Sequence, residues 1–217
     1  MDVRAGRGWV RALVVLALLA QSLLLIEPRQ AAALPADFVD EVVFSGLQLP
    51  TAVAFAPAPD GRVFVAEKSG LVKVFDSVTD TTSSRFADLR TNVHDFLDRG
   101  LLGIAVHPEF PAVPWVHVLY SHDAPIGGTA PVWNDGCLSS PTRCTASGRL
   151  SRLRVGAEGT ATTEEVLIED WCSNFPSHSI GSLRFDAQGS LYAGGGDGAR
   201  PRRPTTARRA SRPVETR

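Results

Sequence analysis

The residues best suited to chemistry lie towards the end of the sequence, where a histidine and an aspartate flank a short apolar region. His178 precedes the apolar run 183–185, and Asp197 follows a second apolar run at 191–194, with Gly189 between the two runs. This order predicts a strand, a turn and a second strand. Because a hairpin brings its two ends together, we expect Asp197 to orient the ring of His178, with His178 acting as a general base.

The remaining histidines and one arginine are expected to be structural. A lone histidine in a strand-rich protein is more often a packing residue than a catalyst, and this alternative also stands for His178. His107 precedes Pro108, an arrangement typical of a turn that closes a strand. Arg99 is expected to be a buried ion-pair partner. The histidines without any partner pattern are His94, His117 and His122.

The three cysteines suit an oxidising compartment better than a metal site or a redox centre. Cys137 and Cys144 flank a polar loop and form a possible disulfide. Cys172 is then left over, unless it pairs with one of those two instead. The sequence has no CxxC motif and no histidine at ligand spacing from a cysteine pair, so it predicts no metal site and no thiol redox catalysis.

Residues 40–198 are rich in short expected strands of Val, Leu and Phe. The runs are bounded by Gly, Pro, Asp or Ser, which is typical of strands, and no long segment has the apolar spacing of a helix. One helical turn is expected at 92–97. The expected strands cover residues 42–44, 52–55, 63–67, 72–75, 101–106, 116–120, 150–155, 165–168, 183–185 and 191–194.

A unit of strand, turn and strand recurs along this region, at 52–66, 101–120 and 183–193. Repetition of such a unit at a long period predicts an all-β fold of the β-propeller class, in which four-stranded blades surround an axis. Residues 34–199 suffice for about three blades. The loop 121–147 would lie on one face, where the binding sites of propellers form.

The N-terminal segment has the features of an export signal. Residues 1–33 combine a positive start with Arg4, Arg7 and Arg11, an apolar run at 12–26 and the small residues 31–33, which predicts a signal peptide and a secreted or periplasmic protein. An uncleaved membrane anchor is the alternative, although the run is shorter than the roughly 20 residues that span a bilayer. Residues 34–199 carry a net charge of −9, which argues against nucleic-acid binding.

Residues 200–217 contain seven arginines and a single large aliphatic residue, Val214. Such a segment cannot bury enough apolar surface to order itself. It is interpreted either as a disordered basic tail or as an out-of-frame end. The second interpretation is favoured, because the preceding strand pattern breaks off and a functional tail more often follows a completed domain.

Three segments resemble the glucose/sorbosone dehydrogenase family, and they come in the family's order. Residues 98–110, DRGLLGIAVHPEF, resemble its RGLLGxAxHPxF segment. Residues 49–67 resemble a second segment, and the His178 stretch with Gly196-Asp197-Gly198 resembles a third. The likeness covers about residues 40–198, and the combination is specific although each piece alone is weak.

The resemblance implies a six-bladed propeller with pyrroloquinoline quinone on its axis and calcium beside it. His178 corresponds to the base that takes the proton of the anomeric hydroxyl, and Asp197 to the aspartate that orients the base. Asp98 falls in the sugar pocket, where many members carry Gln or Glu. Ser177 departs from the Asp that some members have before the histidine.

The activity that the resemblance implies is that of a quinoprotein oxidoreductase. Such an enzyme oxidises an aldose sugar at C1, transfers hydride to the quinone and passes electrons to an external acceptor. The family's quinone-binding Lys and Arg residues and its calcium ligands would lie in later blades, so we expect this chain alone to be a truncated, inactive copy. The alternative is a non-catalytic secreted propeller that binds carbohydrate or protein.

Overall fold

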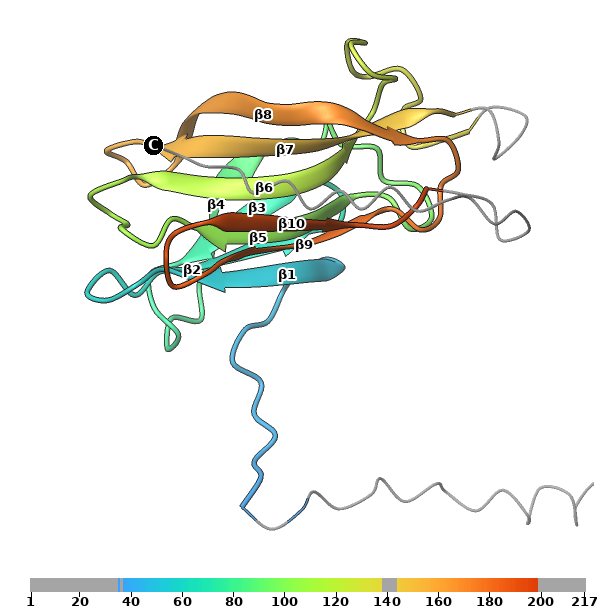
Figure 1. The fold of residues 1–217 in the computed structure, drawn as a ribbon. Helices are drawn as coiled ribbons and strands as arrows, with labels where there is room; N and C mark the ends of the chain where they lie inside the picture. Colours follow the sequence, from blue (N-terminus) through green and yellow to red (C-terminus); the bar gives the residue numbers. More distant parts are fainter. Residues whose placement is uncertain (1–34, 36, 138–143, 199–217) are drawn as a thin grey trace, which may run out of the picture. The chain divides into compact units, whose positions relative to one another are not determined.

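Ten β-strands form the regular structure of the computed structural model, which describes residues 35, 37–137 and 144–198. No helix occurs among these residues (Figure 1). The expected signal segment 1–33 and the arginine-rich segment 200–217 lie outside the described residues. The strands are β1 (Pro50–Phe55), β2 (Val63–Glu67), β3 (Leu71–Phe75), β4 (Ser84–Asp88), β5 (Leu101–Val106), β6 (Trp115–His122), β7 (Ala146–Val155), β8 (Ala161–Ser173), β9 (Ile180–Phe185) and β10 (Leu191–Gly195).

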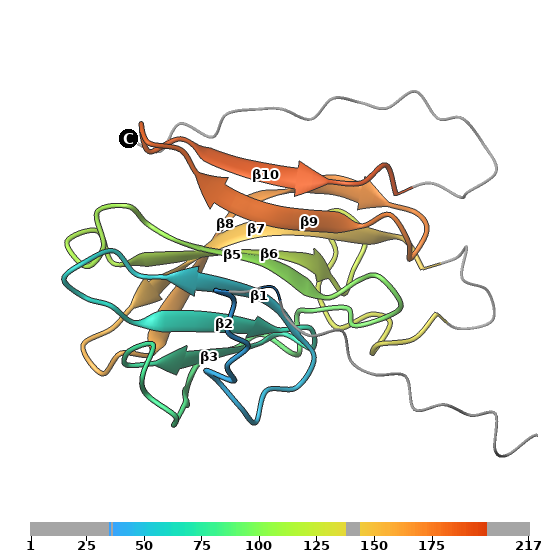
Figure 2. The ribbon, with the colours of Figure 1, turned by 90° about the horizontal axis from the view of Figure 1, so that it is seen from below.

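The strands form three antiparallel sheets in which each strand pairs with its neighbours in the sequence. Sheet 1 has the order β1-β2-β3-β4, sheet 2 the order β5-β6-β7-β8, and sheet 3 consists of β9 and β10. Figure 2 shows sheet 2 between the other two sheets. The all-β prediction is confirmed, and the expected three blades correspond to two four-stranded sheets and one two-stranded sheet in the described residues.

The alternation of side chains along each strand explains how the sheets pack. In β6, Val118 and Tyr120 belong to the core between sheets 1 and 2, whereas Leu119 belongs to the core between sheets 2 and 3. Successive side chains of a strand point to opposite faces, so a strand in a middle sheet must be apolar on both. This requirement accounts for the buried run of β6.

The core between sheets 1 and 2 contains a group of three aromatic rings. Phe64 of β2 packs edge-to-face against Phe86 of β4, with 5.0 Å between ring centroids. It also packs against Phe110, in the turn after β5, at 6.2 Å. Burial of a large apolar side chain stabilises a fold by about 1.5–3 kcal/mol, so these rings contribute substantially to holding the two sheets together.

Three local expectations differ from the structure. Residues 42–44 form no strand, and Phe44 instead stacks on Phe75 at a centroid distance of 4.1 Å. The segment 92–97 forms no helical turn, because Val93 makes an isolated bridge with His122. The strand β4 was not expected, since Phe86 is its only large apolar residue.

The first residues of the described chain belong to a separate unit. Met1–Glu41 and Val42–Arg217 form two compact units, and the described residues of the first contain no strand. A search of the described residues finds no helix with the length and apolar character needed to cross a membrane.

Candidate active site

His178 and Asp197 lie at the open end of the β9–β10 hairpin, as the sequence pattern predicts. Ile180 of β9 pairs with Gly195 of β10, so His178 lies two residues before the last pair of the ladder and Asp197 two residues after it. The Nδ1 atom of His178 lies 3.0 Å from Oδ1 of Asp197. An ionised carboxylate only accepts hydrogen bonds, so Nδ1 of His178 carries the proton and donates it to Asp197.

This tautomer leaves the other ring nitrogen as the basic one. With Nδ1 of His178 protonated, Nε2 holds the lone pair that accepts a proton. The side chains of His178 and Asp197 are 49% and 40% exposed, so a substrate can reach the ring. The pair therefore has the arrangement of a general base and its orienting carboxylate.

Backbone hydrogen bonds beyond the strand ends fix the two residues. The amide of Gly196 donates to the carbonyl of Ser179 at 2.6 Å, and the amide of Gly198 donates to the carbonyl of His178 at 3.0 Å. His178 itself has a φ of 53°, in the left-handed region. A non-glycine residue in such a conformation costs about 1–3 kcal/mol and persists only when its surroundings hold it there.

Two glycines of the run Gly194-Gly195-Gly196 are required by close packing. A Cβ atom on Gly196 would lie 2.2 Å from the carbonyl oxygen of His178. A Cβ atom on Gly195 would lie 2.3 Å from the ring of Trp171, which comes from β8. The run is thus explained by the approach of the backbone to His178 and Trp171, a reason that its sequence alone did not disclose.

Asp98 lies on the segment that adjoins the histidine. Its amide donates to the carbonyl of Pro176 at 3.1 Å, two residues before His178. Residue 98 is exposed. The structure therefore brings the turn before β5 and the turn before β9 together, and all three residues singled out in the sequence lie in this region.

Arg99 is buried, as expected, but it is not an ion-pair partner among the described residues. Its Nη1 donates to the carbonyl of Cys144 at 2.8 Å and to Nδ1 of His94 at 3.1 Å. Its Nη2 donates to the carbonyl of Ser173 at 2.7 Å. Burial lowers the pKa of Arg99 to about 10, which leaves the guanidinium charged at neutral pH. The expected carboxylate is replaced by carbonyl groups and an imidazole.

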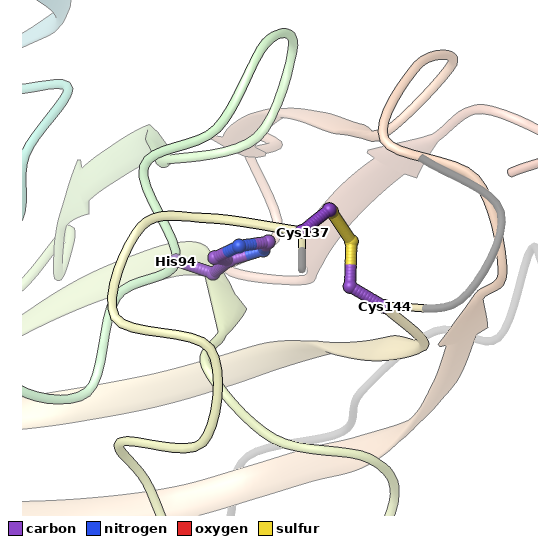
Figure 3. A group of neighbouring side chains, drawn as sticks. All are labelled: His94, Cys137 and Cys144. Atoms are coloured by element: carbon purple, nitrogen blue, oxygen red, sulfur yellow. A yellow bond between two sulfur atoms is a disulfide. The ribbon is translucent and has the colours of Figure 1, made fainter. Parts of the chain in front are cut away.

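Cys137 and Cys144 are joined by a disulfide, with 5.3 Å between their Cα atoms. Cys172 is an exposed free thiol. Figure 3 shows the ring of His94 beside the disulfide, and the ligand atoms of these three residues lie within 4.8 Å of one another. Because the two sulfurs are bonded to each other, they are not the thiolates that a zinc ion requires.

The other histidines are structural. His117 and His122 are buried in β6, and burial lowers the pKa of each to about 4. Burial also lowers the pKa values of His94 and His107. The rings of His107 and His117 pack against Phe185, so these residues fill the space between sheets 2 and 3.

Comparison with known proteins connects this site to a family. The sequence model of the family described as Glucose / Sorbosone dehydrogenase matches residues 47–213. The chain belongs to the glucose/sorbosone dehydrogenase family. The sequence resemblance is therefore confirmed, and the match extends well beyond the three segments that first indicated it.

Solved structures support the fold. The PQQ-bound aldose sugar dehydrogenase from Streptomyces coelicolor is 17% identical, with a TM-score of 0.51, over 74% of this chain and 41% of that one. A glucose dehydrogenase is 21% identical, with a TM-score of 0.53, over 70% of this chain and 42% of that one. The three sheets are part of a β-propeller. This chain spans about two fifths of the length of these structures.

The described residues are better suited to supply the proton acceptor of a quinone-dependent reaction than to bind the quinone itself. A carboxylated quinone needs cations around it. The guanidinium of Arg99 is turned towards buried carbonyls, and Lys68 is engaged by Asp95. Calcium takes about 6–8 oxygen ligands. In the described ranges, the only close group of three His, Cys, Asp or Glu ligand atoms is the one around the disulfide, and it contains no carboxylate oxygen for calcium.

Proposed function

We propose that this chain supplies the catalytic base of a quinoprotein sugar dehydrogenase that oxidises an aldose at C1. The observation that carries the proposal is the 3.0 Å hydrogen bond between Nδ1 of His178 and Asp197, at the exposed end of a hairpin in a chain of this family. Pyrroloquinoline quinone is the hydride acceptor that membership of the family suggests.

The part of the chemistry that belongs to this chain is a proton transfer. Nε2 of His178 takes the proton of the anomeric hydroxyl while the C1–H bond breaks and its electron pair leaves with the hydrogen. The positive charge that develops on the ring is stabilised by Asp197 through Nδ1–H. A base of this kind contributes about 10²–10⁴-fold to the rate.

Asp98 is proposed to bind a hydroxyl of the sugar. Its backbone is joined to Pro176, so residue 98, which is exposed, lies beside the segment that leads to His178. A carboxylate accepts hydrogen bonds from sugar hydroxyls, and hydrogen bonds to a charged group contribute about 1.5–3 kcal/mol. Its removal is therefore expected to weaken sugar binding more than it slows the proton transfer.

The test is dye-linked oxidation of aldoses by the full 217-residue chain with added quinone and calcium. If the chain turns over, His178→Asn is expected to lower the rate by about 10²–10⁴-fold while leaving sugar binding within a few-fold, because it removes only the proton acceptor. His107→Asn is the matched control, since that ring packs against Phe185. Turnover by the wild type that His178→Asn leaves unchanged would contradict the proposal.

The same assay tests the finer expectation that this chain alone is inactive. One observation supports that expectation: the chain spans about two fifths of the matched structures. Dye reduction above background by the wild-type chain would disprove it. Turnover that His178→Asn abolishes would exclude the alternative, a non-catalytic propeller that binds carbohydrate or protein.

Export from the cytoplasm and transfer of electrons to an external acceptor are further parts of the proposal. The disulfide between Cys137 and Cys144 supports an oxidising compartment. N-terminal sequencing of the protein recovered from the culture medium or periplasm would test it. A start after residue 33 agrees with a cleaved signal, whereas an intact Met1 in a membrane fraction agrees with an anchor.

A further inference from the structure

We infer that Arg99 is the positioning residue of the His178–Asp197 pair, because its guanidinium fastens the segment on which both residues rest to the loop closed by Cys137 and Cys144. The inference deepens the proposed function and rests on it only for the chemical use of His178. The geometry that Arg99 is inferred to control exists whether or not the chain turns over.

Arg99 joins two segments that the sequence separates widely. On one side, Nη1 donates to the carbonyl of Cys144 at 2.8 Å. On the other side, Nη2 donates to the carbonyl of Ser173 at 2.7 Å and lies 3.3 Å from its Oγ. Arg99 is 0% exposed, so these bonds are shielded from competing water.

Ser173 in turn supports the histidine. Its Oγ donates to the carbonyl of Phe175 at 3.0 Å, which fixes the start of the segment that leads to His178. The next carbonyl, that of Pro176, accepts the amide of Asp98 at 3.1 Å. The turn that contains Arg99 therefore holds this segment through its main chain and through its side chain.

Ser173 also supports the aspartate. Gly198 lies against it so closely that a Cβ atom on the glycine would be 3.2 Å from Cα of Ser173. Gly198 follows Asp197 directly, and its amide donates to the carbonyl of His178 at 3.0 Å. A displacement of Ser173 would thus move both members of the pair and change the bond between them.

The disulfide fixes the other end of the Arg99 link. Cys144 is 1% exposed, and its bond to Cys137 restrains the residue that presents the carbonyl to Arg99. His94 adds a second restraint, because its Nδ1 accepts from Nη1 of Arg99 and its Nε2 donates to the carbonyl of Gly136 at 3.2 Å. This bonding requires an uncharged His94, in agreement with its burial.

The test compares the ring nitrogens of His178 by ¹⁵N NMR in the full chain and in three variants. Arg99→Met removes all donors at similar length. Arg99→Lys keeps the charge but cannot reach both carbonyls with a planar fork. Arg152→Met is the matched control, because Arg152 pairs with Glu165 at the surface, through bonds of 2.9 and 3.0 Å.

In the wild type, the two ¹⁵N signals are expected to be well separated, as one tautomer predominates. Arg99→Met is expected to bring them together and to speed exchange of the Gly198 amide about tenfold or more. Arg99→Lys should give a smaller change of the same kind, and Arg152→Met none. A folded Arg99→Met protein with wild-type His178 signals and Gly198 exchange would overturn the inference.

A second measurement serves if Arg99→Met does not fold. Reduction of the disulfide in the wild type leaves Arg99 in place but frees the loop of Cys144, and it should shift the His178 signals in the direction of Arg99→Lys. Unchanged His178 signals in both the reduced wild type and Arg99→Lys would overturn the inference. Altered His178 signals together with turnover that His178→Asn leaves unchanged would uphold the positioning role and count against the proposed function, so the two failures are distinguishable.

Discussion

Asp197 determines which nitrogen of the His178 ring carries the proton. An imidazole without a partner interconverts between two tautomers, and only the one protonated on Nδ1 presents a basic Nε2 to a substrate. The 3.0 Å bond from Nδ1 to a carboxylate selects that form. The exposure of both side chains, 49% and 40%, means that the selection depends on this bond rather than on burial.

Substitution of Asp197 tests this selection directly. In Asp197→Asn the amide either donates to or accepts from Nδ1, so we expect both tautomers of His178 to be populated and its two ¹⁵N ring signals to approach each other. Any turnover by the chain should fall by at least about tenfold, in keeping with the loss of an orienting carboxylate. Asp88→Asn, which changes a carboxylate paired with Arg90 on sheet 1, is the control.

The contacts of individual residues were only partly predictable from the sequence. The meeting of His178 and Asp197 followed from a hairpin between them, which has a clear sequence pattern. The contacts of Arg99 did not, because three of its acceptors are two main-chain carbonyls and a histidine nitrogen. Carbonyl groups are present at every residue, so no residue type marks them as partners.

At the scale of elements, the β9–β10 hairpin depends on glycines that allow the backbone to come close. Gly196 faces the carbonyl of His178, and Gly195 faces the ring of Trp171. Both glycines lie where the ladder ends and the turn towards Asp197 begins. The hairpin can therefore position His178 and Asp197 only if these two positions lack side chains.

Substitution of Gly196 tests whether this position must lack a side chain. In Gly196→Ala the new Cβ would lie 2.2 Å from the carbonyl oxygen of His178, so the backbone must shift and the bond to Asp197 must lengthen or break. We expect destabilisation of about 1–3 kcal/mol, as for other overpacked sites, together with a changed His178 tautomer signal. Chemical denaturation measures the first effect and ¹⁵N NMR the second.

Gly194→Ala is the matched control for this prediction. It lies two residues away in β10, and its added Cβ would meet no atom closer than 3.7 Å, an ordinary contact. Its stability should stay within about 0.5 kcal/mol of the wild type, which is usual for a surface substitution. Similar losses of stability in both alanine variants would show that β10 as a whole is sensitive to added side chains, and that the close approach of Gly196 to His178 is not the cause.

Most strands were predictable because their apolar runs are bounded by turn residues, but two segments were misjudged for physical reasons. The strand β4 lies at the edge of sheet 1 and buries Phe86 and Ala87 alone, so its sequence, Ser-Arg-Phe-Ala-Asp, has no apolar alternation to detect. Residues 42–44 are apolar enough for a strand. Their role is to cover sheet 1, where Phe44 stacks on Phe75.

At the scale of the whole molecule, sheet 2 is covered on both faces and several of its polar side chains are enclosed. His117 and His122 of β6 are 0% and 2% exposed. Burial disfavours the charged form of each ring, with the nearby charges of Arg152 and Arg149 acting in the same direction, and the pKa of each falls to about 4. Packing of the three sheets is thus linked to the protonation of these histidines.

The stability of the chain should consequently depend on pH. A histidine with an unfolded pKa of 6.5 and a folded pKa of about 4 contributes stability that is fully present above pH 6.5 and is lost as the pH falls towards 4. For His117 the loss amounts to about 3 kcal/mol. Chemical denaturation at a series of pH values between 7.5 and 4.5 should show a nearly constant free energy of unfolding above pH 6.5 and a steady fall below it.

His117→Leu isolates one contribution to this pH dependence. The variant removes one group that takes up a proton on unfolding, so its free energy of unfolding should fall less steeply below pH 6.5 than that of the wild type. A slope identical to that of the wild type would show that His117 does not contribute. Acid sensitivity would then have to arise from His122 and the other buried histidines.

The link between Asp98 and Pro176 has an evolutionary consequence. It joins an amide hydrogen to a carbonyl oxygen, and every amino acid except proline possesses the former. The codon for residue 98 can therefore drift without loosening the neighbouring loop. On the proposed role of Asp98 in sugar binding, single mutations there would exchange one sugar for another, which makes this position a natural starting point for a saturation library.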